Sequence, residues 1–122
     1  MQRALEAVYG MGRLAFGGGL IAAPRQLGGV LLGDEAREPA VRIALRTYGT
    51  RDVVLGLGTL RSVAREGHGG DWLLAGVTSD LLDAGVQLGE WSDLPPEKRL
   101  LGVLMALGSA GAGMALLARR SE

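Results

Sequence analysis

Residues 100–118 read LLGVLMALGSAGAGMALLA, a run of nineteen residues without a charged side chain. A helix rises ~1.5 Å per residue, so this run would span about 28 Å. That length is close to the ~30 Å hydrocarbon thickness of a bilayer. Basic residues flank the run at 98–99 and at 119–120, where they would anchor a spanning helix at both interfaces. The run therefore predicts a membrane-spanning helix over residues 97–120.

Three further segments are predicted to be helices, and they cover residues 4–23, 40–66 and 71–90. The 40–66 segment has only a short apolar core, because Arg42, Arg46, Arg51, Asp52 and Arg61 interrupt it, so whether it fully spans the bilayer stays open. Pro24 ends the first segment, because proline cannot continue a helix interior, and its position directly after the run also argues against a cleaved signal peptide. The sequence predicts one all-α domain, a bundle of four helices that mostly cross the bilayer.

The connections are expected to be irregular. Residues 25–39 contain glycine pairs and mixed charge, which indicates a loop; the apolar stretch 30–32 within it could dip into the interface or start a short helix. His68, the single histidine, lies between glycines in an expected turn, and no serine is marked as its catalytic partner. We interpret His68 as a solvated turn residue.

Composition excludes several classes of protein. The 122 residues carry 13 basic and 13 acidic side chains, so the net charge is zero and no basic stripe predicts nucleic-acid binding. The absence of cysteine excludes disulfides and thiol chemistry. Charged residues make up 21%, which is also ordinary for soluble proteins, so a soluble helical bundle with a buried C-terminal helix stays open as an alternative.

Five charged residues within the apolar segments are the candidate site. Asp80 and Asp83 are three residues apart and share one helix face. Ionisable side chains inside a membrane cost about 2.5–3.5 kcal/mol each and usually face the bundle interior with a partner. Arg51 is the preferred partner and Arg13 the next, with Asp52 as a third carboxylate.

Three interpretations of this polar cluster compete. The simplest is a structural set of ion pairs that fixes how the helices align. A second is a proton or ion relay, since neighbouring carboxylates favour the protonation of one of them. The third is divalent-metal chemistry, which we do not adopt because two aspartates are too few oxygen ligands for Mg²⁺. No cofactor or metal is expected, and we expect no enzymatic activity.

Small residues recur at helical spacing, which permits close helix packing in lipid. The predicted packing faces are Ala15, Gly19 and Ala23; Gly85 and Gly89; Gly108 and Ala112; and Ser109 and Gly113. A weak repeat also matches Tyr9, Gly10, Gly17 and Gly19 with residues 39 positions later, Tyr48, Gly49, Gly56 and Gly58. In a glycine-rich chain we attribute four identities to chance.

Two stretches carry a family resemblance. They read RTYGTRDVVLG at 46–56 and WLLAGVTSDLLDA at 72–84. With the glycine-rich run that ends at Pro24, the chain resembles a family of small four-helix membrane proteins of unknown function that are frequent in actinobacteria. The resemblance implies a membrane location but supplies no known activity. The Arg-Asp motif of the family corresponds to Arg51 and Asp52, and its Asp-x-x-Asp motif to Asp80 and Asp83.

The sequence thus predicts a small multi-pass protein of the bacterial plasma membrane. Its expected role is structural or interactive, with the lipid bilayer and a second copy or another membrane protein as partners and no nucleic acid. A small proton- or ion-coupled transporter or channel is the alternative.

Overall fold

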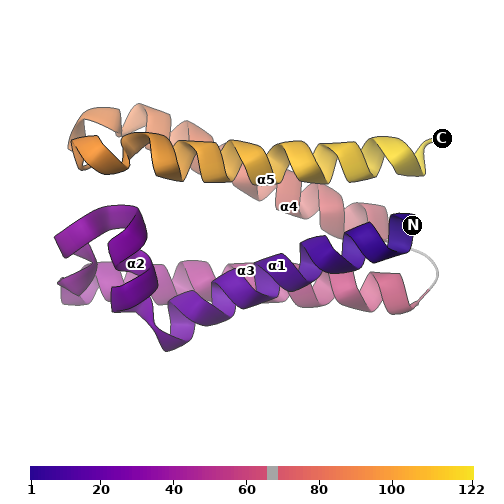
Figure 1. The fold of residues 1–122 in the computed structure, drawn as a ribbon, viewed down its shortest axis with the longest axis horizontal. Helices are drawn as coiled ribbons and strands as arrows, with labels where there is room; N and C mark the ends of the chain where they lie inside the picture. Colours follow the sequence, from indigo (N-terminus) through magenta and orange to yellow (C-terminus); the bar gives the residue numbers. More distant parts are fainter. Residues whose placement is uncertain (66–68) are drawn as a thin grey trace.

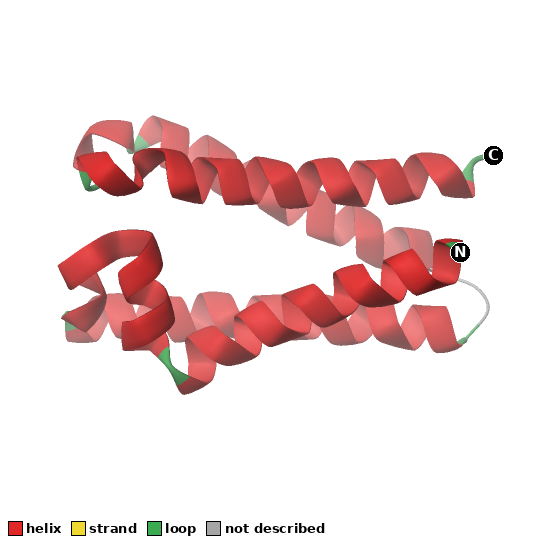
Figure 2. Ribbon diagram, in the orientation of Figure 1, coloured by secondary structure: helices red, strands yellow, loops and turns green. Residues whose placement is uncertain are grey.

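The computed structural model describes residues 1–65 and 69–122 of the chain. Over these ranges it is helical and without β-strands, so the all-α prediction is confirmed. Figure 2 shows how short the connecting loops are. The elements are α1 (Gln2–Ala22), α2 (Pro24–Leu32), η1 (Gly33–Arg37), α3 (Pro39–Ala64), α4 (Gly69–Gly89), η2 (Trp91–Asp93), η3 (Pro96–Lys98) and α5 (Arg99–Arg120).

The four long helices agree with the predicted bounds to within two residues wherever the chain is described. The last residue of the expected 40–66 helix and the turn around His68 fall at 66–68, outside the described residues. The expected loop at 25–39 was wrong, because most of it forms α2 and η1. Pro24 ends α1 but also occupies the first turn of α2, where its fixed φ suits a helix and its missing N–H is not needed.

The long helices form two antiparallel pairs (Figure 1). We call α1 with α3 the first helix pair, and α4 with α5 the second helix pair. Both chain ends lie at one end of the bundle, and α2 lies at the other, where the connection from α4 to α5 also turns. The two pairs are therefore stacked with their axes running between the same two ends.

The compact apolar cluster of the molecule is small and lies at the α2 end. Leu20, Ala36 and Leu45 are buried at its centre, so α1, η1 and α3 meet there. Leu27 and Leu31 of α2 pack against it, which explains why α2 is helical: one of its faces is apolar and covers this cluster. Away from this end, further apolar residues of α3, α4 and α5 are also buried, among them Leu73 and Val77, together with small and polar residues.

The first helix pair is joined along four glycines, Gly10 and Gly17 of α1 and Gly49 and Gly56 of α3, which we call the glycine seam. A Cβ atom on Gly49 would lie 2.6 Å from the carbonyl oxygen of Gly17, and one on Gly56 would lie 2.6 Å from that of Gly10. Real Cβ atoms do not approach so closely. Seven-residue spacing in both helices therefore lets the two backbones touch at two successive levels.

The predicted small-residue faces are only partly used within the chain. Gly113 is buried against Val77 and Tyr9, and Ser109 is on the same inward face. Gly85, Gly89 and Gly108 are exposed instead, and a Cβ on any of them would meet open space, so these positions do not pack against another helix of this chain. Spacing of four puts residues on one helix face but does not say which face turns inward.

We predict that adjacent glycines of α1 respond oppositely to alanine. Gly17→Ala should lower the free energy of unfolding by roughly 1–3 kcal/mol, because its methyl group would collide with the α3 backbone at Gly49 and Val53. Gly18→Ala meets open space and should raise it by about 0.5–1 kcal/mol through better helix propensity. Denaturant unfolding of the full chain measures both, and equal effects would contradict the seam.

Candidate functional site

Arg13 of α1 lies at the centre of the site and contacts the other three long helices. Its guanidinium donates to the Asp52 carboxylate of α3 at 2.8 Å and to the Asp80 carboxylate of α4. It also donates to the Gly76 carbonyl at 3.1 Å and to the Ser109 hydroxyl of α5 at 3.3 Å. Arg13, Asp52 and Asp80 are only 6%, 4% and 3% exposed, so the charges compensate one another away from solvent.

A second ion pair lies nearer the surface. Arg51 of α3 binds Asp83 of α4 in a bidentate manner, with N–O distances of 2.9 and 2.6 Å. The Tyr48 hydroxyl donates to the same carboxylate at 2.7 Å. The Arg51 side chain keeps about a third of its surface exposed. Two fork-shaped contacts therefore link the two helix pairs, one buried and one partly buried.

All five residues singled out in the sequence come together here. Asp83 has the partner that was expected, Arg51, whereas Asp80 pairs with Arg13. Asp52 bridges the two sets: it accepts from Arg13 and lies 3.7 Å from the Arg51 guanidinium. With every group ionised, three carboxylates face two guanidinium groups, so the cluster carries one net negative charge.

Two tyrosines complete the site and were not predicted. Tyr9 accepts a hydrogen bond from Arg13 at 3.1 Å, and the Arg13 guanidinium carbon lies 5.2 Å from the Tyr9 ring centroid. The Arg51 guanidinium carbon lies 4.2 Å from the Tyr48 ring centroid, while the Tyr48 hydroxyl donates to Asp83. Each arginine is thus oriented by an aromatic face as well as by a carboxylate. Tyr9 precedes Arg13 by four residues and Tyr48 precedes Arg51 by three, and both spacings place the two side chains on one helix face. This spacing could have revealed the tyrosines from the sequence.

A separate ion pair closes the end of the bundle where both termini lie. Glu6 is almost fully buried and accepts from Arg120 at 2.7 and 2.5 Å and from Gln2 at 2.6 Å. This pair was missed, because Arg120 was interpreted as an interface anchor and 114 residues separate the two partners. It ties the start of α1 to the end of α5.

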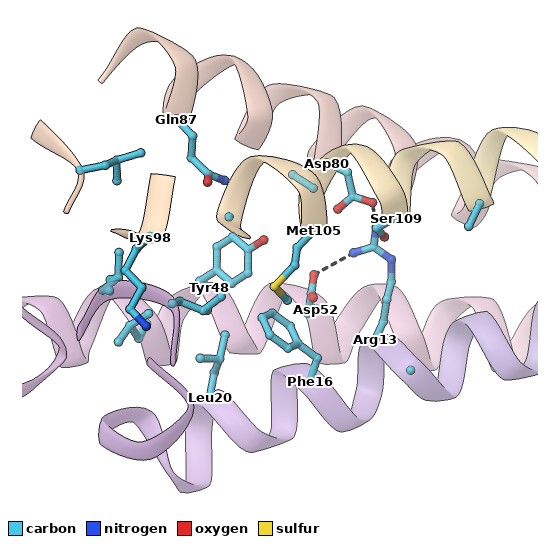
Figure 3. A pocket seen from close by; sticks show the side chains of 18 of the residues that line it. Arg13, Phe16, Leu20, Tyr48, Asp52, Asp80, Gln87, Lys98, Met105 and Ser109 are labelled. Atoms are coloured by element: carbon cyan, nitrogen blue, oxygen red, sulfur yellow. Dashed lines mark hydrogen bonds and ion pairs between the residues drawn. The ribbon is translucent and has the colours of Figure 1, made fainter. Parts of the chain in front are cut away.

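A cavity of about 440 Å³ lies between the two helix pairs, beside the cluster (Figure 3). Arg13, Asp52 and Asp80 form its polar inner end. Its volume falls within the usual range of about 300–1,000 Å³ for ligand pockets. Further lining residues are Phe16, Leu20, Tyr48, Gln87, Lys98, Met105 and Ser109.

What the Arg/Asp cluster can do chemically depends on whether its carboxylates are already paired. Each of the three carboxylates already faces a guanidinium group. Over residues 1–65 and 69–122, acidic and histidine side chains nowhere gather in threes that could hold a metal ion. The arrangement can therefore fix helix positions, and its surplus negative charge can be neutralised by a proton or a cation.

We predict that Arg13→Met destabilises the fold by about 3–5 kcal/mol, because Asp52 and Asp80 then stay buried without a cation. The triple change Arg13→Met, Asp52→Asn and Asp80→Asn should recover a large part of that loss, since no uncompensated charge remains. Arg46→Met on the exposed face of α3 is the matched control and should change stability by less than about 0.5 kcal/mol. Denaturant unfolding compares them, and equal losses for Arg13→Met and Arg46→Met would refute the central role of Arg13.

Comparison with known proteins does not indicate a function for this chain. No family model, no curated protein and no solved structure matches the chain. What the site does must therefore be inferred from its buried ion pairs, its cavity and the surface that surrounds them.

Proposed function

We propose that this chain is a multi-pass integral membrane protein with a structural or interaction role, in which the Arg/Asp cluster joins two helix pairs. This proposal rests on one observation: charged side chains are buried inside the bundle, and large apolar side chains are exposed on its outside. Arg13, Asp52 and Asp80 are buried, whereas Leu82, Val86 and Leu104 are 65%, 66% and 62% exposed. A soluble monomer rarely leaves large contiguous apolar patches in water, so an apolar surrounding fits this surface better.

The position of the exposed charges supports the same placement. In the described part of the chain, the exposed charged side chains lie within about two turns of a helix end or in the connections. Between these ends the outward side chains are apolar or small, with a few hydroxyls. The exposed hydroxyls of Thr47 and Thr50 donate to the carbonyls of Ile43 and Arg46, at 3.0 Å each, so they need no water.

One described helix meets the length and hydropathy expected of a membrane span. It covers Pro96–Arg120, with a mean hydropathy of 2.0 over its most apolar 18 residues. A core helix of a soluble protein can have the same composition, but such a helix is mostly buried. Here 28% of the apolar window is buried inside the molecule, which favours contact with lipid. That α1, α3 and α4 also cross the membrane is part of this proposal. It rests on the burial of charged side chains and the exposure of apolar ones described above.

The cluster itself favours a structural role over catalysis. Its carboxylates are held by arginines, and no activated nucleophile accompanies them in the described residues. Between helices in lipid, apolar contacts give little driving force, so polar contacts and close packing decide which helices associate. We accordingly place the protein in a bacterial plasma membrane, in the resembled family of small four-helix proteins, with a second copy or another membrane protein as partner.

We predict that an outward arginine is tolerated at the start of α5 and not at its middle. Leu107→Arg would put a charge near the bilayer centre, at about 2.5–3.5 kcal/mol, whereas Leu100→Arg lies near the helix end and can reach the interface. Both leucines are exposed, so an aqueous bundle should accept both changes alike. The fraction of tagged full-length chain that resists a carbonate wash of membranes should fall for Leu107→Arg only.

Two outcomes would contradict the membrane placement. One is that the unchanged protein washes off with carbonate or needs no detergent. The other is that both variants behave as the unchanged chain does in the carbonate-resistant fraction. In either case residues 100–118 would form an ordinary core helix.

Proton- or ion-coupled transport is the second candidate, and one observation favours it. Three carboxylates face two guanidinium groups beside a 440 Å³ cavity, which leaves one negative charge to be compensated. A proton shared among Asp52, Asp80 and Asp83 would provide that compensation. The cavity would give this proton, or a cation, a route into the cluster.

For this candidate we predict that the double change Asp80→Asn and Asp83→Asn abolishes proton flux while the bundle still folds. Flux is measured with a pH-sensitive dye inside proteoliposomes, and folding by circular dichroism and elution volume. Asp93→Asn, an exposed residue of η2, is the control and should conduct normally. If the double variant conducts like the unchanged protein, or the unchanged protein does not conduct, the relay is excluded.

A further inference from the structure

The cavity between the helix pairs is long and has unlike ends. Along α5 and the residue before it, its lining extends from Lys98 to Ala112, which is about 21 Å at ~1.5 Å per residue. Figure 3 shows Arg13 at one end, Lys98 and Gln87 toward the other, and Phe16 and Met105 between them. The cavity is therefore an apolar passage that has charged groups at both ends.

The charged groups at the two ends differ in whether they already have hydrogen-bond or ion-pair partners. At the inner end, the Arg13 guanidinium is shared by two carboxylates, two hydroxyls and a carbonyl. At the outer end, the Lys98 side chain is half-buried in the cavity wall, and its ammonium group has no hydrogen-bond or ion-pair partner among residues 1–65 and 69–122. A partly desolvated ammonium group favours an anion. The outer end therefore lacks a negatively charged partner.

We propose that this cavity binds an amphiphile with an anionic head and an acyl chain, its head on Lys98 and its chain along Phe16 and Met105 toward the cluster. The opposite orientation is disfavoured, because Asp52 and Asp80 at the inner end would repel an anion. A cationic amphiphile fits less well, since Lys98 stands at the outer end and Arg13 already holds both inner carboxylates. The apolar passage accommodates the chain, and the unpaired ammonium selects the charge of the head.

The position of Lys98 agrees with this ligand class. It directly precedes α5, the proposed spanning helix, so its ammonium would lie at the interface, where anionic head groups are found. This part of the reasoning rests on the proposed membrane placement. Binding itself can be measured in detergent, so its failure is distinguishable from failure of the carbonate test.

The first experiment titrates the full chain, in neutral maltoside micelles, with three ligands of equal chain length: dodecanoate, dodecylammonium and dodecanol. Calorimetry should show dodecanoate binding at least tenfold more tightly than either of the others. Shorter carboxylates should lose about fourfold in affinity for each methylene removed. Equal affinities for the three ligands would overturn the proposal, because the cavity would then be an unselective apolar space.

The second experiment assigns the head to Lys98. Lys98→Gln should weaken dodecanoate binding about tenfold, and Lys98→Arg should retain it. Arg99→Gln is the matched control, because the adjacent Arg99 side chain donates to the carbonyls of Leu94 and Ser92 and does not line the cavity. An unchanged affinity in Lys98→Gln would refute the assignment. Met105→Trp fills the passage and should abolish binding without lowering the thermal midpoint, which keeps the test decisive if Lys98→Gln folds poorly.

A third measurement identifies the source of the ligand. Thermal unfolding is compared in nanodiscs of phosphatidylglycerol and of phosphatidylcholine, for the unchanged chain and for Lys98→Gln. A Lys98-dependent rise in midpoint with phosphatidylglycerol points to a bilayer lipid. Selective dodecanoate binding without that rise points to a free fatty acid. The absence of both would overturn the proposal.

Discussion

The fold depends on the Arg13 guanidinium, a charge buried between four helices. A planar guanidinium offers its N–H groups in a fixed fork, so one side chain can bind carboxylates from α3 and α4 at once. Removing such a group from water is costly unless it is fully paired. Any sliding of α1 against α3 or α4 would separate these charges in a low-dielectric interior. The ion pairs therefore fix the register of the helices more strictly than apolar contacts between them would.

The glycine seam makes this arrangement reachable. Gly10 and Gly17 bring α1 against Gly56 and Gly49 of α3 closely enough for Arg13 to bind Asp52. The same glycines belong to the repeat at an offset of 39, which we attributed to chance from the sequence. The antiparallel contact supplies a physical reason for the match: each helix must place glycines seven residues apart to meet the other, so both acquire the same pattern without any need for common ancestry.

Local features could be predicted from the sequence, and long-range ones could not. Apolar runs, prolines and glycine-rich turns located the long helices, and the three-residue spacing of Asp80 and Asp83 put them on one face. The sequence contains no feature that links Glu6 to Arg120 across 114 residues, because each looks like an ordinary residue near a helix end. It also could not decide whether Gly85 and Gly89 turn inward, since a face of small residues serves equally well for a neighbour outside the chain. Pro24 ends the first helix as predicted, but its place in the first turn of α2 was not foreseen, because one proline can end a helix and begin the next.

The cavity follows from the way the two helix pairs are held together. A compact apolar cluster forms around Leu20 and Leu45, at the α2 end, and further apolar side chains such as Leu73 and Val77 are buried along the bundle. Farther along, the pairs are joined by ion pairs at Arg13 and Arg51 and by the Glu6 pair at the terminal end. Polar contacts act at points and do not fill the volume between helices, as interlocking leucines would. A bundle whose alignment is set by charge can therefore keep open space at its centre without losing its register.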